Sequence, residues 1–238
     1  VAVSLADKLD TLFGFFRAGL LPTGSKDPFA LRRAAIAVIR LIETNALRAY
    51  ISEVARFWSA DNTTGPGLAV EDFLHDRLGV MMKEDAVRYD IVLASTALGA
   101  RSDGDLLRVR RRAEALQKFI AAEDGANLLA GYKRAANILK QAEGVDPNAA
   151  APSDLGSEEQ ALLSALDSAE PKAVAAIEAE QFEDAMAALA SLRAPIDAFF
   201  DGVMVNDPDP EKRAFRLGLL ARFRDAVSQV ADFSKIEG

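Results

Sequence analysis

The stretch DPDPEKRAFRLGLLARFRDAV, residues 207–227, indicates most plainly what fold this chain adopts. Asp209 followed by Pro210 is typical of a helix start, because an Asp side chain caps free amides and proline tolerates the first helical position. Apolar side chains then recur at three- and four-residue steps, which places them on one face of a helix. That face consists of Leu217, Leu220, Phe223, Val227 and Val230. The stretch therefore predicts a long amphipathic helix near the end of the chain.

Helical periodicity also runs through the rest of the 238 residues. Residues 3–16, VSLADKLDTLFGFF, predict the first helix. Asp27 is expected to cap a second helix with Pro28 in its first turn, and Leu31, Ala35, Val38 and Ile42 form its buried face. Further helices are expected over residues 70–84, 84–98, 102–123, 125–142 and 182–200, and an acidic, alanine-rich helix is expected before the last of these.

Three local signals and one absence complete this fold prediction. Residues 61–67, DNTTGPG, have the composition of a loop. Asp103 is expected to cap the helix that begins near residue 102, and Pro195 is expected to kink or restart the helix over 182–200. No stretch of useful length alternates with the period of a strand. The predicted fold class is therefore all-α, built from helical bundles.

Composition limits the kinds of protein that the chain can be. Half of the residues are hydrophobic and 27% are charged, so a sizeable core can be buried. There is no cysteine, which excludes disulfides and thiolate metal sites and fits a reducing compartment such as the cytoplasm. No apolar run approaches the roughly 18 residues that a membrane span needs, and no secretory signal is visible.

The net charge of −8 is unevenly distributed along the chain. Residues 143–192 contain eleven acidic side chains and a single basic one, Lys172. We call these residues the acidic block. The remainder is slightly basic, so the low overall pI does not argue against a nucleic-acid partner. Within the block, residues 145–157, VDPNAAAPSDLGS, have the composition of a linker.

The stretch PTGSKDPFALRRAA, residues 22–35, contains a Gly-Ser-Lys triplet that needs an explanation. A phosphate-binding P-loop requires two glycines at fixed spacing after a strand, whereas this stretch has one glycine and follows a helix. Two interpretations stay open. The start of the second helix binds an anion with Lys26, Arg32 and Arg33, or it is simply a capped structural helix.

The side chains that usually perform catalysis or bind metals are scarce. His75 is the only histidine, so a histidine dyad or a multi-histidine metal site is impossible within this chain. Asp7 and Asp10 lie one turn apart but have no further ligands nearby, and Asp207 with Asp209 lacks the rest of a calcium loop. The sequence predicts no catalytic residue and no metal site.

Four stretches give the chain a family resemblance, in order and at fitting spacing. They are LADKLDTL (5–12), PTGSKDPFALRRAA (22–35), KRAANIL (133–139) and IDAFFDGVMVNDPDPEKRAFRLGLLARFR (196–224). Together they resemble the C-terminal region of the β subunit of bacterial tetrameric glycyl-tRNA synthetase. Val1 already lies inside a periodic apolar pattern, so we expect the chain to be part of a longer protein.

The resemblance implies three regions. Residues 1–22 look like the end of a truncated HD-like helical domain, in which Asp7 matches the last acidic position of the HD pattern. Residues 23–124 would form a middle helical region. Residues 125–238 are similar to the DALR-type anticodon-binding domain of arginyl-tRNA synthetase. The acidic block is a departure from this pattern, because its carboxylates make part of the domain a poor surface for RNA.

The resemblance also implies the activity and partners. The complete enzyme attaches glycine to its tRNA with ATP and Mg²⁺ as a complex of two α and two β chains, and the α subunit holds the active site. The β chain supplies tRNA binding and partner contacts, so no cofactor is expected in this part. The implied location is cytoplasmic, without membrane contact.

Basic and polar residues in or near the matched stretches are the candidates for contacting tRNA. They are Lys26, Arg32, Arg33, Lys133, Arg134, Asn137, Arg213, Arg216 and Arg222. The alternative function is a helical scaffold that docks the α subunit with little direct RNA contact. A third class, an HD phosphohydrolase, would need several metal-binding histidines, and this chain has a single histidine.

Overall fold

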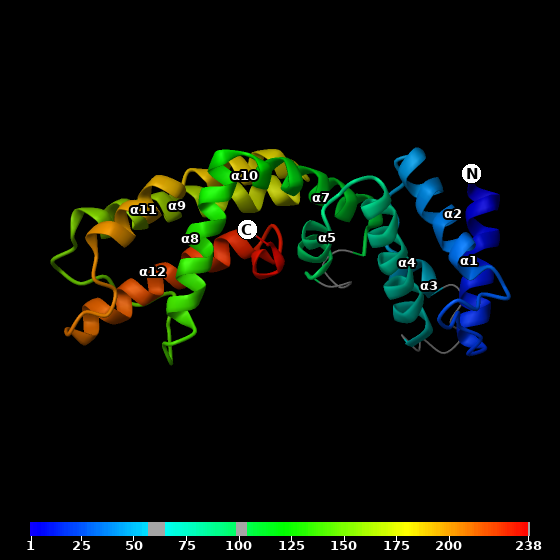
Figure 1. Cartoon of the computed structure of the whole chain (residues 1–238), viewed down its shortest axis with the longest axis horizontal. Helices are drawn as coiled ribbons and strands as arrows, with labels where there is room; N and C mark the ends of the chain where they lie inside the picture. Colours follow the sequence, from blue (N-terminus) through cyan, green and yellow to red (C-terminus); the bar gives the residue numbers. More distant parts are fainter. Residues whose placement is uncertain (57–64, 99–103, 238) are drawn as a thin grey trace. The chain divides into compact units, whose positions relative to one another are not determined.

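The computed structural model describes residues 1–56, 65–98 and 104–237. Cα packing divides the chain into two compact units, Val1–Ala113 and Glu114–Gly238 (Figure 1). Throughout the described ranges the regular structure is helical, apart from two isolated bridges, which confirms the all-α prediction. None of the helices described is long and apolar enough to cross a membrane. The three-region division at residues 22 and 124 stays a prediction.

The first unit is built on three helices that pack against one another. They are α1 (Ala2–Arg17), α2 (Leu31–Thr44) and α4 (Gly65–Glu84). The shorter α3 (Ile51–Ala55) and α5 (Tyr89–Thr96) pack against α4. The four apolar positions predicted for the second helix are all buried, as are Leu9, Leu12 and Phe13 of α1. Helix α7 (Leu106–Ala121) contains the boundary between the units.

The start of α2 differs from its prediction. The helix begins at Leu31 rather than Pro28, because Ala30 adopts a left-handed conformation with φ of 56° and interrupts the turn. Asp27 still supplies the cap, from four residues upstream. Its carboxylate accepts hydrogen bonds from the amides of Leu31 and Arg32, at 2.8 and 3.0 Å. The predicted capping residue is right, and the predicted helix boundary is wrong.

Two more boundaries were mispredicted in this unit. The expected helix over 84–98 is reduced to α5, because a turn at Ala86, whose φ is 65°, separates it from α4. Helix α4 begins at Gly65, inside the expected loop over 61–67, whose first four residues lie outside the described part. The predicted cap at Asp103 also lies outside that part. Asp105 accepts a hydrogen bond from the Arg108 amide at 3.0 Å, so it caps the first turn of α7.

The second unit is a bundle of five helices and a short 3₁₀ turn. They are α8 (Glu123–Leu139), α9 (Ser157–Glu178), α10 (Phe182–Ala190), α11 (Arg193–Gly202), α12 (Pro210–Ser228) and η1 (Phe233–Lys235). Helix α8 packs against α11 and α12, and α9 packs against α10, α11 and α12 (Figure 1). The core includes Phe199 and Phe223, which are fully buried. Burial of each phenyl side chain stabilises the unit by about 2 kcal/mol.

Local signals in this unit predicted its helix ends well. Asp209 accepts a hydrogen bond from the Glu211 amide at 2.9 Å, and Pro210 is the first residue of α12, as expected. Helix α10 ends at Ala190 and α11 begins at Arg193, so Pro195 lies in the first turn of a new helix. This confirms that Pro195 restarts the helix.

The expected linker over 145–157 is irregular up to Gly156, but it is packed rather than free. A Cβ added at Gly218 of α12 would lie only 2.7 Å from the carbonyl oxygen of Asp146. Because real Cβ atoms essentially never approach an oxygen so closely, glycine is required for the linker to lie against α12. This contact positions the start of the acidic block beside the last helix.

Candidate nucleic-acid interface

Helix α8 presents a polar outer face on the second unit. Its inner positions, including Tyr132, Ala135 and Leu139, are buried in the bundle, and this register turns Arg134 and Asn137 outward. Lys133 lies between the two faces and is partly buried. Two of the three candidates predicted on α8 therefore point to solvent.

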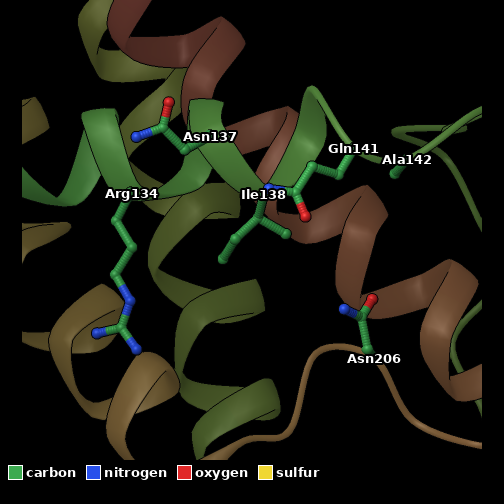
Figure 2. A pocket seen from close by; sticks show the side chains of 6 residues that line it. All are labelled: Arg134, Asn137, Ile138, Gln141, Ala142 and Asn206. Carbon is green, nitrogen blue, oxygen red and sulfur yellow. The ribbon is translucent and has the colours of Figure 1, made fainter.

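The outer face of α8 ends in an open pocket of about 530 Å³. Its lining residues are Arg134, Asn137, Ile138, Gln141, Ala142 and Asn206. Figure 2 shows Arg134 and Ile138 extending to one side of α8, with the Gln141 carboxamide beside Ile138. Asn206 projects from the connection that leads into α12, and the Asn137 side chain extends from the side of α8 opposite to Arg134 and Ile138. The pocket thus combines one cation and three carboxamides around an apolar side chain.

Arg134 is held in place by α11. Its guanidinium lies over the Phe200 ring, 4.2 Å from the centroid, and donates a hydrogen bond of 3.3 Å to the Phe200 carbonyl oxygen. A cation over an aromatic face is attracted by about 1 kcal/mol. One face of the guanidinium is thereby covered by Phe200, while the exposed Arg134 side chain still contributes to the pocket wall.

Arg216 of α12, in contrast, is engaged within the protein. Its guanidinium donates to Glu159 and to Asp207, each at 2.5 Å, and to the Met204 carbonyl oxygen at 2.9 Å. Only 12% of the Arg216 side chain and 3% of the Glu159 side chain is exposed. Burial works against the charge of Arg216, but hydrogen bonds to the two carboxylates outweigh it and raise the pKa of the guanidinium.

Arg222 follows the same pattern one and a half turns later. It binds Glu170 through two hydrogen bonds, of 3.1 and 2.7 Å, and Asp167 through one of 2.9 Å. The hydrogen bonds to Glu170 are the main cause that raises the pKa of Arg222. Both carboxylates belong to α9, so the acidic block neutralises two of the three arginines predicted to contact RNA from α12.

Arg213 is the third of these arginines and is exposed. Within the described ranges its guanidinium makes one long hydrogen bond, of 3.4 Å, to the Asp207 carbonyl oxygen. The neighbouring Lys212 pairs with Asp154 at 2.7 Å, and this hydrogen bond is the main cause that raises the pKa of Lys212. Arg213 therefore keeps more of its charge available to a ligand than Arg216 or Arg222 does.

The three basic candidates of the first unit surround the turn before α2. Thr23 and Lys26 exchange backbone hydrogen bonds of 3.0 and 2.8 Å, and Arg32 donates to the Gly24 carbonyl oxygen at 2.6 Å. Lys26 and Arg33 are exposed. Because Asp27 already accepts the first amides of α2, an anion at this helix start would meet a carboxylate in place of free N–H groups.

Sequence reasoning missed Gln141, Asn206 and the aromatic support of Arg134. The two carboxamides lie just outside the regular helices, at the end of α8 and in the connection before α12, where periodicity carries no information. The signal that could have identified them is their position, because Asn206 lies within the matched stretch 196–224 and Gln141 follows the stretch 133–139 by two residues. Among the described residues, no group of three or more potential metal ligands comes together.

Comparison with known proteins places both units in a family context. A family described as "Glycyl-tRNA synthetase beta subunit" matches residues 1–97, and one described as "DALR anticodon binding domain" matches residues 128–237. Glycine--tRNA ligase beta subunits of Phenylobacterium zucineum and Rhodospirillum centenum are 48% and 49% identical, over 99% and 100% of this chain. That of Paracoccus denitrificans is 47% identical over 100%. These alignments cover 34% to 35% of each relative, so the chain spans about a third of their length.

Proposed function

Because this chain belongs to the family of glycyl-tRNA synthetase β subunits, as its four matched stretches predicted, we propose that it is a tRNA-binding region of such an enzyme. The observation that carries this proposal is that residues 128–237 match an anticodon-binding domain. The exposed face of α8 and its pocket lie within that match. The candidate interface on α8 is therefore inside the domain whose description implies RNA binding.

Contacts to the RNA backbone would come from exposed cations, and contacts to bases from carboxamides. In the second unit we assign phosphate contacts to the exposed Arg213 and the partly buried Lys133, with Arg134 and Asn137 facing the bases. Arg216 and Arg222 would support binding mainly by stabilising the fold, because carboxylates of the same unit already pair with them. In the first unit, Lys26, Arg32 and Arg33 would contact the phosphate backbone elsewhere on the tRNA.

The rest of the activity would lie outside this chain. In the complete enzyme the α subunit would use ATP and Mg²⁺ to activate glycine, and this region would hold the tRNA for aminoacylation. We expect two α and two β chains in the cytoplasm. This division of labour is supported by the scarcity of catalytic side chains in the 238 residues.

A scaffold that docks the α subunit is the second candidate function. Leu20, Leu21 and Phe29 of the first unit are each more than 40% exposed, and exposed apolar side chains of this size are common at protein interfaces. Capture of the α subunit in the absence of RNA, combined with tRNA affinity that no change in this chain alters, would favour the scaffold.

The tRNA-binding proposal is tested by charge reversal in the complete enzyme. We expect Arg213→Glu to weaken tRNA binding and to reduce the slope of log K against log salt by about 1, because one phosphate contact is lost. Lys172→Glu is the matched control, since Lys172 is exposed in the acidic block and its ammonium group donates a hydrogen bond to the neutral Ser168 hydroxyl. Equal affinities and equal salt slopes for wild type, Arg213→Glu and Lys133→Glu would count against the proposed phosphate contacts.

A further inference from the structure

We propose that the pocket between the end of α8 and the connection before α12 receives a single unstacked base of the bound RNA. Gln141 and Asn206 would read the edge of that base, and Arg134 would stack on its plane. This inference rests on the proposed function, and it adds the part of the RNA that the pocket recognises. Gln141 and Asn206 would then determine specificity rather than general affinity.

The chemistry of the lining favours a base over an anion. A phosphate or carboxylate is normally held by several cations or by free backbone amides, and this pocket offers only Arg134. Carboxamides, in contrast, donate and accept hydrogen bonds side by side, which matches the paired donors and acceptors on the edge of a nucleobase. No carboxylate lines the pocket, so the π-face and ring edges of a base meet no repelling charge.

Arg134 is arranged to act as a stacking surface. One side of its guanidinium covers Phe200, and the hydrogen bond to the Phe200 carbonyl oxygen fixes the orientation of the group. A flat base entering the pocket would lie on the other side and extend the stack to three layers. Arg guanidinium planes and aromatic rings are common supports for splayed-out bases of single-stranded RNA. Because the support is already formed, little side-chain entropy is lost on binding.

Arg216 positions Asn206 by binding the residues around it in the connection before α12. It binds the Met204 carbonyl oxygen and the Asp207 carboxylate, which lie on the two sides of Asn206 in sequence. Glu159 anchors Arg216 in turn, and its other oxygen accepts the Gly156 amide at 2.6 Å. The connection that carries Asn206 is thus tied to the start of α9. Arg216 is therefore a positioning residue for base recognition, without contact to the base.

The test uses the complete αβ enzyme, its tRNA, and a series of tRNAs that each lack the base at one unpaired position. Wild-type enzyme should lose roughly tenfold in affinity for one member of this series, the amount typical of a stacked base. Asn206→Ala and Gln141→Ala should each lose affinity for intact tRNA, yet bind that one abasic tRNA like wild type. Gln160→Ala serves as control, because this exposed residue lies on α9, outside the pocket lining, and its carboxamide bonds to Ser164 of the same helix.

Arg216→Ala should reproduce the specificity defect of Asn206→Ala, and combining the two changes should add nothing at that position. A merely stabilising Arg216 would lower affinity for every tRNA in the series by the same factor, and this result would remove its positioning role.

Two outcomes separate this inference from the proposed function. If wild-type enzyme binds tRNA and the pocket variants lose the same factor for every member of the series, or nothing at all, the base pocket is wrong and the tRNA-binding role stands. If binding of wild-type β chains to tRNA depends on no residue of this chain, the proposed function fails together with the inference.

Discussion

The outer face of α8 and the surface of α12 both carry arginines in matched stretches, yet they differ in what surrounds those arginines. On α12, Arg216 and Arg222 are surrounded by carboxylates from α9 and from the preceding connection. On α8, Arg134 lies over an aromatic ring and opens onto a pocket lined with carboxamides. One helix therefore uses its positive charge to hold the bundle together, and the other leaves it accessible.

This difference explains the acidic block. Its position in a region that we propose to bind RNA is unexpected when net charge is counted along the sequence alone. In the fold, Glu159, Asp167 and Glu170 are the counter-charges of the last helix. The block thus leaves fewer cations accessible on α12, so the candidate interface is concentrated on α8 and Arg213.

The largest effect should follow the loss of Arg216. Arg216→Ala leaves Glu159 buried without its ion-pair partner, and removing one member of a buried pair typically costs about 3 kcal/mol or more. We expect the free energy of local opening, measured by hydrogen exchange of the α9 and α12 amides, to fall by that amount. Arg213→Ala is the control and should change it by less than about 0.5 kcal/mol, because Arg213 is exposed. Similar losses of opening free energy in both variants would contradict the expected difference between Arg216 and Arg213.

A smaller effect is expected for the pair Arg222 and Glu170. Both side chains retain some contact with water, with 21% and 28% exposed, but the two-point geometry strengthens their interaction. A double-mutant cycle with Arg222→Ala and Glu170→Ala should give a coupling energy of about 1 kcal/mol. Additive single and double variants would show that the pair does not contribute to the stability of the unit.

The smallest effect should appear on acidification. The amide of Asp209 and the guanidinium of Arg216 lower the pKa of Asp207, and Lys212 lowers the pKa of Asp154. Because these folded-state pKa values lie below the unfolded value of about 3.9, the stability they add is present above that pH and is lost as the pH falls through the folded-state values.

Urea unfolding between pH 6 and pH 3 measures this loss. We expect the midpoint of Asp207→Asn to fall less steeply below about pH 4 than that of wild type, since one titrating group has been removed. Parallel curves for the two proteins would contradict the role of Asp207 in the Arg216 cluster.

Much of the fold follows from local sequence signals, and the exceptions have a common cause. The start of α12 is encoded by Asp209 and Pro210, which are adjacent to the turn that they stabilise. The start of α2 and the shortening of α5 depend on Ala30 and Ala86 in left-handed conformations. Alanine favours helix, so nothing in the sequence marks these interruptions, and tertiary packing outweighs the local preference.

The candidate interface was predictable only in part, for a similar reason. The KRAANIL stretch identified Arg134 and Asn137 because their outward orientation follows from the register of a single helix. The ion pairs of Arg216 and Arg222 join residues 57 and 52 positions apart, a separation at which spacing patterns carry no information. The position of Asn206 in the pocket depends on Arg216, which the distant Glu159 holds in place. Sequence could therefore name the basic residues but not sort them by accessibility.

Ultraviolet crosslinking of the complete αβ enzyme to its tRNA, with crosslinked peptides identified by mass spectrometry, tests the central claim most directly. Our account predicts crosslinks in the peptide that contains Arg134, Asn137 and Gln141 and in the one that contains Asn206. It predicts none at Arg222 or at the α9 residues that pair with it. Crosslinks concentrated on α9 and the Arg222 segment of α12, with α8 unmodified, would contradict the account.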